Sequence, residues 1–129
     1  MSSDNANLNN MLESVKEILL SAKAENIDTF FNSVVGSTFL VISASSERHV
    51  KALLSAVKLY VKSETDYKYK IEGDNTCTWV IMEIFDINIT INIFRKEVRE
   101  YYDVDHLWSY IKNNKIQEAV DKFRDKDDE

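Results

Sequence analysis

The sequence predicts an α/β fold, specifically a mixed-sheet α/β sandwich, and three observations support this prediction. Two segments, near the N-terminus and in the middle of the chain, carry apolar residues at helical spacing. Several short runs rich in Val, Ile, Phe and Thr end at turn residues, as strands do. The 129 residues suit a single domain, which at this size buries roughly two-thirds of its unfolded surface.

The first predicted helix begins at Leu8, after a flexible leader formed by residues 1–7, and fades near Asn26. Its apolar residues recur every three or four positions, which gives the helix one apolar face. They are Leu8, Met11, Leu12, Val15, Ile18, Leu19 and Ala22.

Two strands are predicted next, separated by a loop at residues 32–37 that contains Gly36. Residues 27–31 can form a short first strand. Residues 38–43 form a nearly continuous apolar run of β-forming types, which is typical of a central strand covered on both faces.

A second helix is predicted after this strand. Ser45 or Ser46 supplies the N-cap, and Glu47 lies in the first turn, where a negative charge is favourable. A strand at residues 67–71 then completes a βαβ crossover. The apolar face of the helix consists of Val50, Leu53, Leu54, Val57, Tyr60 and Val61.

The following segment predicts an antiparallel hairpin. Residues 72–75 have the composition of a turn. Trp79–Ile84 and residues 89–94 are rich in β-forming types, and residues 85–88 connect them. Together with the earlier strands, the expected sheet has about five strands.

The C-terminal part predicts a short strand or extended segment at residues 98–102. A short helix is expected at residues 104–112, with Asp103 as its cap. Asn113 and Asn114 then interrupt the regular structure.

A final amphipathic helix is expected after this break, followed by a charged end at residues 124–129. We therefore divide the chain into a domain of residues 1–112 and a C-terminal amphipathic helix with a charged tail at residues 113–129. The apolar residues of the last helix are Ile116, Ala119, Val120 and Phe123.

The net charge of −6 argues against direct, sequence-specific binding to nucleic acid, because phosphate backbones favour a surplus of Lys and Arg. An acidic protein can instead dock on a basic protein. No apolar run approaches the roughly 20 residues of a membrane span. The first residues resemble neither a secretory signal nor a transit peptide. With Cys77 as the single cysteine, a reducing, cytoplasmic location is expected.

Motifs for catalysis or metal binding are not found. His49, Cys77 and His106 are not spaced as ligands, so no metal is expected. The only glycines, Gly36 and Gly73, form no phosphate-binding loop, and no histidine lies near Cys77 in sequence. We therefore expect no catalytic residues and no cofactor.

One enzymatic alternative stays open, namely a small nucleotidyltransferase-like enzyme that binds nucleotides. Such enzymes combine a Gly-Ser pair near a helix with two carboxylates that hold metal ions. The chain offers Gly36 and Ser37, but these lead into a predicted strand. It also offers Asp86-Ile87-Asn88, in which the second carboxylate is missing.

The segment from Ile71 onward resembles the ribosomal silencing factor family, also called RsfS or Iojap. The shared features are Glu-Gly, a polar stretch, a Trp, two hydrophobic strands around a turn, a Glu-x-Arg-x-x-Tyr segment and a Leu-Trp pair. A second match lies at residues 39–52, and together the matches span roughly residues 8–109. The matching residues are Glu72, Gly73, Trp79, Glu97, Arg99, Tyr102, Leu107 and Trp108.

This resemblance implies a fold like that of nucleotidyl transferases without the catalytic residues, and a protein that is not an enzyme. Family members bind ribosomal protein fourteen on the joining face of the large ribosomal subunit. They thereby block subunit association and repress translation.

The resemblance also places the contact with the partner on the hairpin. For Trp79 a place in the core is the alternative, and for the acidic residues a solvated turn. A homodimer through exposed strand edges is a further reading. The expected contact residues are Trp79, Ile81, Glu83, Phe85, Asp86 and Asn88.

The chain departs from the family at several positions. Phe85-Asp86 replaces a Gly-Asp pair at the turn, and the hairpin is about two residues longer, a shift that preserves which face each side chain takes. Ala44 replaces a glycine after the central strand. The segment after Lys112 has no family counterpart that we identify.

Overall fold

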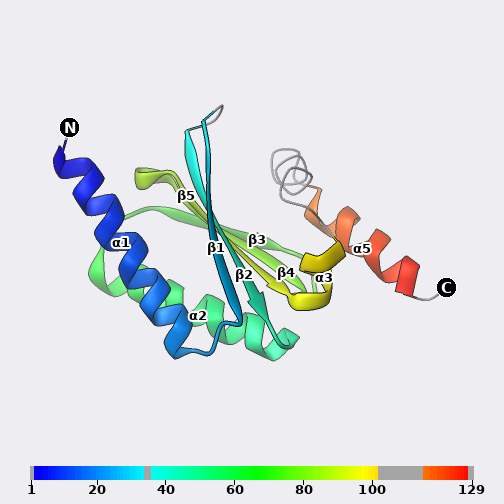
Figure 1. The fold of residues 1–129 in the computed structure, drawn as a ribbon. Coiled ribbons are helices and arrows are strands. Elements are labelled where there is room, and N and C mark those ends of the chain that lie inside the picture. The colour runs from blue at the N-terminus through cyan, green and yellow to red at the C-terminus, as the bar shows by residue number, and fades with distance from the viewer. Residues whose placement is uncertain (1, 34–35, 102–114, 128–129) are drawn as a thin grey trace.

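A five-stranded mixed sheet carries helices on both faces in the computed structural model, which describes residues 2–33, 36–101 and 115–127 (Figure 1). The predicted mixed-sheet α/β sandwich is therefore confirmed. The strands are β1 (Asn26–Asn32), β2 (Ser37–Ala44), β3 (Tyr69–Gly73), β4 (Trp79–Ile84) and β5 (Ile89–Arg95). The helices are α1 (Ser2–Ser21), α2 (Glu47–Glu64), α3 (Lys96–Tyr101) and α5 (Ile116–Asp127), with a 3-10 turn η1 at Phe85–Ile87.

The strand order is β1-β2-β5-β4-β3, so β1 and β3 form the two edges. β2 and β5 run parallel at the centre, and the other neighbouring pairs are antiparallel. β3 therefore runs in the direction of β2, and α2 connects these two strands, as the predicted crossover requires. The β4–β5 hairpin is also confirmed, with Trp79 opposite Phe94 and Ile84 opposite Ile89.

The first core layer lies between the sheet and the pair α1 and α2. The cap of α2 forms as predicted, because the Ser46 side chain accepts a hydrogen bond from the His49 backbone N–H. The buried residues of α2 are spaced as a single face that packs on the sheet. They are Val50, Leu53, Val57 and Val61.

The second core layer covers the opposite face, where α3 and α5 meet residues of the sheet. The predicted helix at Ile116 is confirmed, because its apolar residues are all at most 5% exposed. In Figure 1, α3 and α5 lie together beside the end of the sheet where β4 begins and β5 ends. The sheet residues of this layer are Phe39, Val41, Trp79, Ile81 and Phe94.

Two expectations about helices differ from the structure. α1 begins at Ser2, so the prediction of a flexible leader at residues 1–7 is wrong for residues 2–7. Polar residues extend the helix because adding a residue to an existing helix costs little compared with starting one. α1 ends at Ser21, before the expected end near Asn26. Two residues after this end, Lys23 adopts a positive φ of 67°, a backbone conformation that is common just past the end of a helix.

The prediction of a short strand or extended segment at residues 98–102 is also wrong, because the helix α3 occupies Lys96–Tyr101. Val and Tyr favour strands in isolation, but here the helix buries Val98 in the second core layer. The helix expected at residues 104–112, its cap Asp103 and the break at Asn113 lie outside the described residues. The division of the chain after residue 112 stays a prediction. None of the described helices has the length and apolar character needed to cross a membrane.

Candidate functional site

The predicted contact residues on the β4–β5 hairpin separate into an interior pair and a surface group. Trp79 and Ile81 are 0% and 1% exposed and belong to the second core layer. The remaining four, Glu83, Phe85, Asp86 and Asn88, reach the surface. We call these four the hairpin-end surface. Their contact with a partner stays a prediction.

Trp79 is held in the interior by stacking and by hydrogen bonds. Its ring lies 4.7 Å from that of Phe94, centroid to centroid. Its indole Nε1 donates to Asn92 Oδ1 at 3.4 Å, and Asn92 Nδ2 donates to the Leu40 carbonyl at 3.4 Å. Because Asn92 is 1% exposed, these bonds satisfy polar groups that would otherwise be costly to bury. The network thus joins β2, β5 and β4.

The loop before β4 is organised by the buried carboxylate of Asp74. Asp74 Oδ1 accepts from the backbone N–H groups of Thr78 at 2.6 Å and Trp79 at 3.0 Å. Asp74 Oδ2 accepts from Thr76 Oγ1 at 2.5 Å. Burial by itself would raise the pKa of Asp74, but the bonds from Thr76, Trp79 and Thr78 outweigh it, so the pKa lies below its usual value. The carboxylate is therefore a structural anion that fixes the start of β4.

The hairpin turn is tied to both neighbouring parts of the sheet. Asn88 adopts a left-handed φ of 51°, which Asn tolerates better than most residues, and its carbonyl accepts from the Thr38 N–H at 2.9 Å. Asp86 Oδ2 accepts from the backbone N–H of Lys68 at 2.9 Å. Phe85 is half exposed at 50%. The turn therefore presents an aromatic ring on a supported backbone.

Glu83 adds negative charge beside the turn. In the β3–β4 register, Glu83 lies opposite Lys70, and Glu72 lies on the same face two residues along. Lys70 Nζ pairs with Glu72 Oε1 at 2.5 Å. Partial burial raises the pKa of Glu83, the Glu72 carboxylate raises it further, and Lys70 opposes them. Negative charge at this position is thus only partly compensated within the protein.

The fragments of a nucleotidyl transferase site lie at the same end of the sheet. Gly36 directly precedes β2, and Ser37 is the first residue of that strand, as expected. The next residue, Thr38, donates to the Asn88 carbonyl. Within the described residues, no three His, Cys, Asp or Glu side chains are grouped so that they could hold a metal ion. The carboxylate of Asp86 is already bonded to backbone. The likeness to nucleotidyl transferases stays a prediction.

The two other chemistry-bearing residues that the sequence singled out, and that the structure describes, have structural surroundings. His49 Nδ1 accepts from the Ser45 backbone N–H at 2.9 Å, and Nε2 lies 2.8 Å from the Ala22 carbonyl. The ring therefore bridges the end of α1 and the start of α2. Cys77 is partly exposed and has a positive φ of 56° in the loop before β4.

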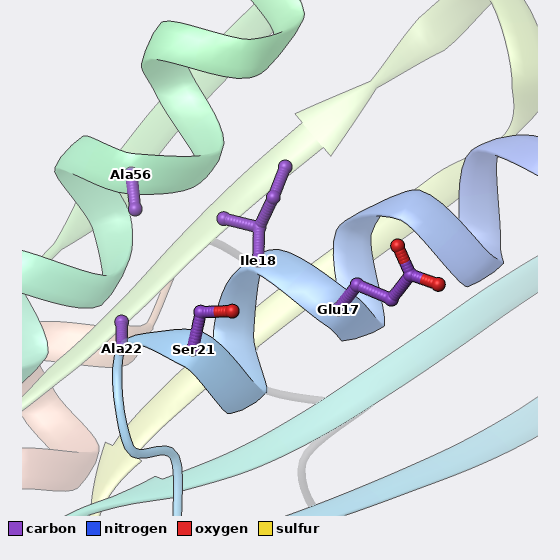
Figure 2. A pocket seen from close by; sticks show the side chains of 5 residues that line it. All are labelled: Glu17, Ile18, Ser21, Ala22 and Ala56. Carbon is purple, nitrogen blue, oxygen red and sulfur yellow. The ribbon is translucent and has the colours of Figure 1, made fainter.

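A shallow hollow of about 470 Å³ lies between α1 and α2 (Figure 2). Figure 2 shows small and aliphatic side chains at this hollow, with one carboxylate, that of Glu17, and one hydroxyl, that of Ser21. This combination offers neither a nucleophile–base pair nor a set of metal ligands. The other residues that line it are Ile18, Ala22 and Ala56.

Sequence reasoning missed the structural roles of Asp74 and Asn92. For Asp74 a signal was present, since Asp followed two residues later by Thr is typical of a side chain that bonds its own loop. For Asn92 no local signal exists, because its partners Trp79 and Leu40 are distant in sequence.

Comparison with known proteins gives a consistent result. The family model described as "Ribosomal silencing factor during starvation" matches residues 5–129. This match extends past residues 8–109, the span of the resemblance in the sequence, and includes the segment after Lys112.

Two curated relatives carry the name ribosomal silencing factor RsfS. The protein from Zymomonas mobilis is 32% identical over 60% of this chain and 57% of its own length. The protein from Chromobacterium violaceum is 30% identical over 71% of this chain and 76% of its own length. The chain thus spans little more than half of the first of these relatives.

Two solved structures share the fold. A crystal structure of a Chromobacterium violaceum protein has a TM-score of 0.66 and 26% identity, covering 79% of this chain and 86% of that chain. A crystal structure of a Bacillus halodurans protein has a TM-score of 0.64 and 24% identity, covering 78% of this chain and 94% of that chain.

Proposed function

The chain belongs to the ribosomal silencing factor family, and we propose that it represses translation by binding the large ribosomal subunit and blocking its association with the small one. The observation that carries this proposal is the family match over residues 5–129. The binding partner on the subunit would be ribosomal protein fourteen on the joining face. The protein would act in the cytoplasm.

The hairpin-end surface is our candidate for the contact, and its chemistry supports this assignment. Phe85 is 50% exposed, and aromatic residues are favoured anchors in protein interfaces. Glu83 and Asp86 place negative charge around it, which suits a basic partner. The net charge of −6 favours the approach of the protein to a basic protein and opposes direct contact with RNA phosphates.

The mechanism we infer is steric, so it requires no bond chemistry from this protein. A protein that occupies a patch needed by the small subunit shifts the subunits toward the separated state by mass action. Trp79, Ile81 and Asn92 would contribute by holding the hairpin in shape, since all three are at most 1% exposed.

A subunit-joining experiment tests the proposal. Purified large and small subunits are mixed with excess protein and separated by sedimentation. We expect fewer joined ribosomes and co-migration of the protein with large subunits. If joining is undiminished at excess protein, the proposal is wrong.

The enzymatic alternative is a nucleotide-binding protein on the same fold. It predicts magnesium-dependent binding of a nucleoside triphosphate that weakens in the Asp86→Ala variant. Titration calorimetry with each nucleoside triphosphate and magnesium is the direct measurement. The bond from Asp86 Oδ2 to the Lys68 N–H disfavours this alternative, since it occupies part of the carboxylate.

A further inference from the structure

The hydrogen bonding between β3 and β4 continues one step past the residues that the two strands pair. Tyr69 lies opposite Ile84 at this end of the register. Lys68 and Phe85 are therefore the next opposite residues, and the Phe85 N–H donates to the Lys68 carbonyl at 3.1 Å. In an antiparallel pair, two residues that form this bond normally exchange a second one, here from the Lys68 N–H to the Phe85 carbonyl. In this protein the second bond has a different acceptor.

The carboxylate of Asp86 takes the place of the Phe85 carbonyl. Asp86 Oδ2 accepts from the Lys68 N–H at 2.9 Å. The Phe85 carbonyl accepts instead from the Asn88 N–H at 3.4 Å, and this bond closes the 3-10 turn η1. The side chain of Asp86 thus allows the chain to leave the strand at Phe85 without leaving the Lys68 N–H unpaired.

The position of Phe85 follows from this exchange of partners. Its ring is 50% exposed, although the preceding residue, Ile84, is 1% exposed and belongs to the first core layer. Ile87, at the end of the turn, packs against the same layer. Phe85 therefore lies between two residues that are anchored in the core, and the backbone bonds of the turn set the position of its ring.

We propose that Asp86 is a positioning residue for the contact with the large ribosomal subunit, because its carboxylate holds Phe85 in the geometry of η1. This inference rests on the proposed function, in which Phe85 is the aromatic anchor of the contact. An anchor that is fixed before binding loses less conformational freedom on association. The negative charge of Asp86 still favours a basic partner, but its acceptor oxygen contributes more to binding.

Two substitutions separate the acceptor from the charge. Asp86→Asn removes the charge and keeps a side-chain oxygen that can accept from the Lys68 N–H, whereas Asp86→Ala removes both. Asp86→Asn should bind large subunits within about threefold of the wild type, and Asp86→Ala should bind about tenfold more weakly. Co-sedimentation over a series of subunit concentrations, at one fixed salt concentration, measures the affinities. Glu25→Ala is the matched control, because it removes an exposed carboxylate at the opposite end of the sheet, where the Glu25 N–H bonds to the Ser43 carbonyl.

Amide hydrogen exchange, measured by NMR on the free protein, tests the turn without the ribosome. The amides of Lys68 and Asn88 should exchange faster in Asp86→Ala than in the wild type or in Asp86→Asn. The first amide loses its acceptor, and the second loses the turn that it closes. The amides of Ile91 and Ile93, which are buried in β5, are the control for overall stability. Unchanged exchange at Lys68 in Asp86→Ala would show that the carboxylate does not hold the turn, which overturns the inference.

The binding results distinguish this inference from the proposed function. If the wild type binds large subunits and Asp86→Ala binds equally well, the inference is wrong and the proposed function stands. The same holds if Asp86→Asn binds as weakly as Asp86→Ala, since the charge and not the acceptor would then account for the loss. A wild type that does not bind large subunits at all overturns the proposed function, and this inference with it.

Discussion

Asp74 and Trp79 are joined by two reciprocal hydrogen bonds. The Trp79 N–H donates to Asp74 Oδ1 at 3.0 Å, and the Asp74 N–H donates to the Trp79 carbonyl at 3.3 Å. These bonds close the loop between β3 and β4 and fix the first residue of β4. The indole of Trp79 is thereby directed into the second core layer, where it is 0% exposed.

Removing the Asp74 carboxylate should destabilise the protein. Asp74→Ala leaves the N–H groups of Thr78 and Trp79 without their acceptor in a buried loop, so the free energy of unfolding should fall by about 1–3 kcal/mol. Urea unfolding followed by circular dichroism measures this. Asp66→Ala, at an exposed loop position, is the control. Equal stability of the two variants would contradict the role of Asp74.

The same carboxylate should make stability depend on acid pH. Because the pKa of Asp74 is lowered in the folded state, its contribution is fully present above the usual pKa of about 3.9 and is lost as pH falls below that value toward the lowered pKa. The stability difference between wild type and Asp74→Asn should therefore shrink below about pH 4. Urea unfolding at several pH values measures it, and a constant difference down to pH 2 would refute this assignment.

Glu83 should affect the pH dependence of stability in the opposite direction to Asp74. The pKa of Glu83 is raised in the folded state, so any stability it contributes is complete below the unfolded pKa and is lost as pH rises through the folded pKa. Glu83→Gln should therefore leave the free energy of unfolding unchanged or raise it by a few tenths of a kcal/mol at pH 7, given solvent screening. If the hairpin-end surface is the contact, this variant should also bind large subunits more weakly.

Glu64→Gln, at the exposed end of α2, removes the same charge and serves as the control for Glu83→Gln. Calorimetric melting gives the stability, and co-sedimentation with large subunits gives the binding. A Glu83→Gln variant that is less stable than its control would show that the raised pKa has been wrongly assigned.

Substitutions of Phe85 and Trp79 should have different effects, the first on binding to large subunits and the second on the stability of the fold. Phe85→Ala alters a half-exposed side chain, so stability should change by no more than about 0.5 kcal/mol while subunit binding weakens about tenfold. Trp79→Ala should lose about 3–5 kcal/mol of stability, because it leaves a cavity beside Phe94. Leu59→Ala, at an exposed position on α2, is the control for Phe85→Ala. Unchanged pull-down of large subunits by Phe85→Ala would remove this residue from the contact.

Gly73 should not tolerate a side chain. A Cβ at this position would lie 2.8 Å from the Trp79 carbonyl oxygen and 2.8 Å from Val80 Cγ1. Gly73→Ala should therefore lower the free energy of unfolding by about 1–3 kcal/mol through overpacking. Thermal unfolding followed by tryptophan fluorescence measures this, and an unchanged midpoint would mean that β3 and β4 can move apart at low cost.

Much of the fold could be predicted because its signals are local. The cap at Ser46, the apolar face of α2 and the two strands of the hairpin follow from turn chemistry and from the spacing of apolar residues. α3 could not be predicted in this way. It has 6 residues, too few to show an apolar repeat, and it includes the strand formers Val98 and Tyr101. It is helical because Val98 reaches the second core layer and Arg99 reaches Asp28.

The sequence indicated the hairpin as the candidate site, but it did not show which of the hairpin residues are exposed. Trp79 and Ile81 alternate with Val80 and Met82 on β4, and all four are apolar and buried. When both faces of a strand are apolar, alternation cannot tell which residues a distant helix will cover. The packing of α5 beside Trp79 and Ile81 in the second core layer decided this.

The sequence by itself determined the mixed α/β class, the hairpin, the capped crossover helix and the family to which the chain belongs, because these depend on residues close together along the chain. Only the tertiary structure decided that Asn92 holds Trp79 in the core, that Phe85 is exposed, and that β1 lies at the edge of the described sheet. Each of these depends on pairing between segments far apart in sequence, and the order β1-β2-β5-β4-β3 sets that pairing.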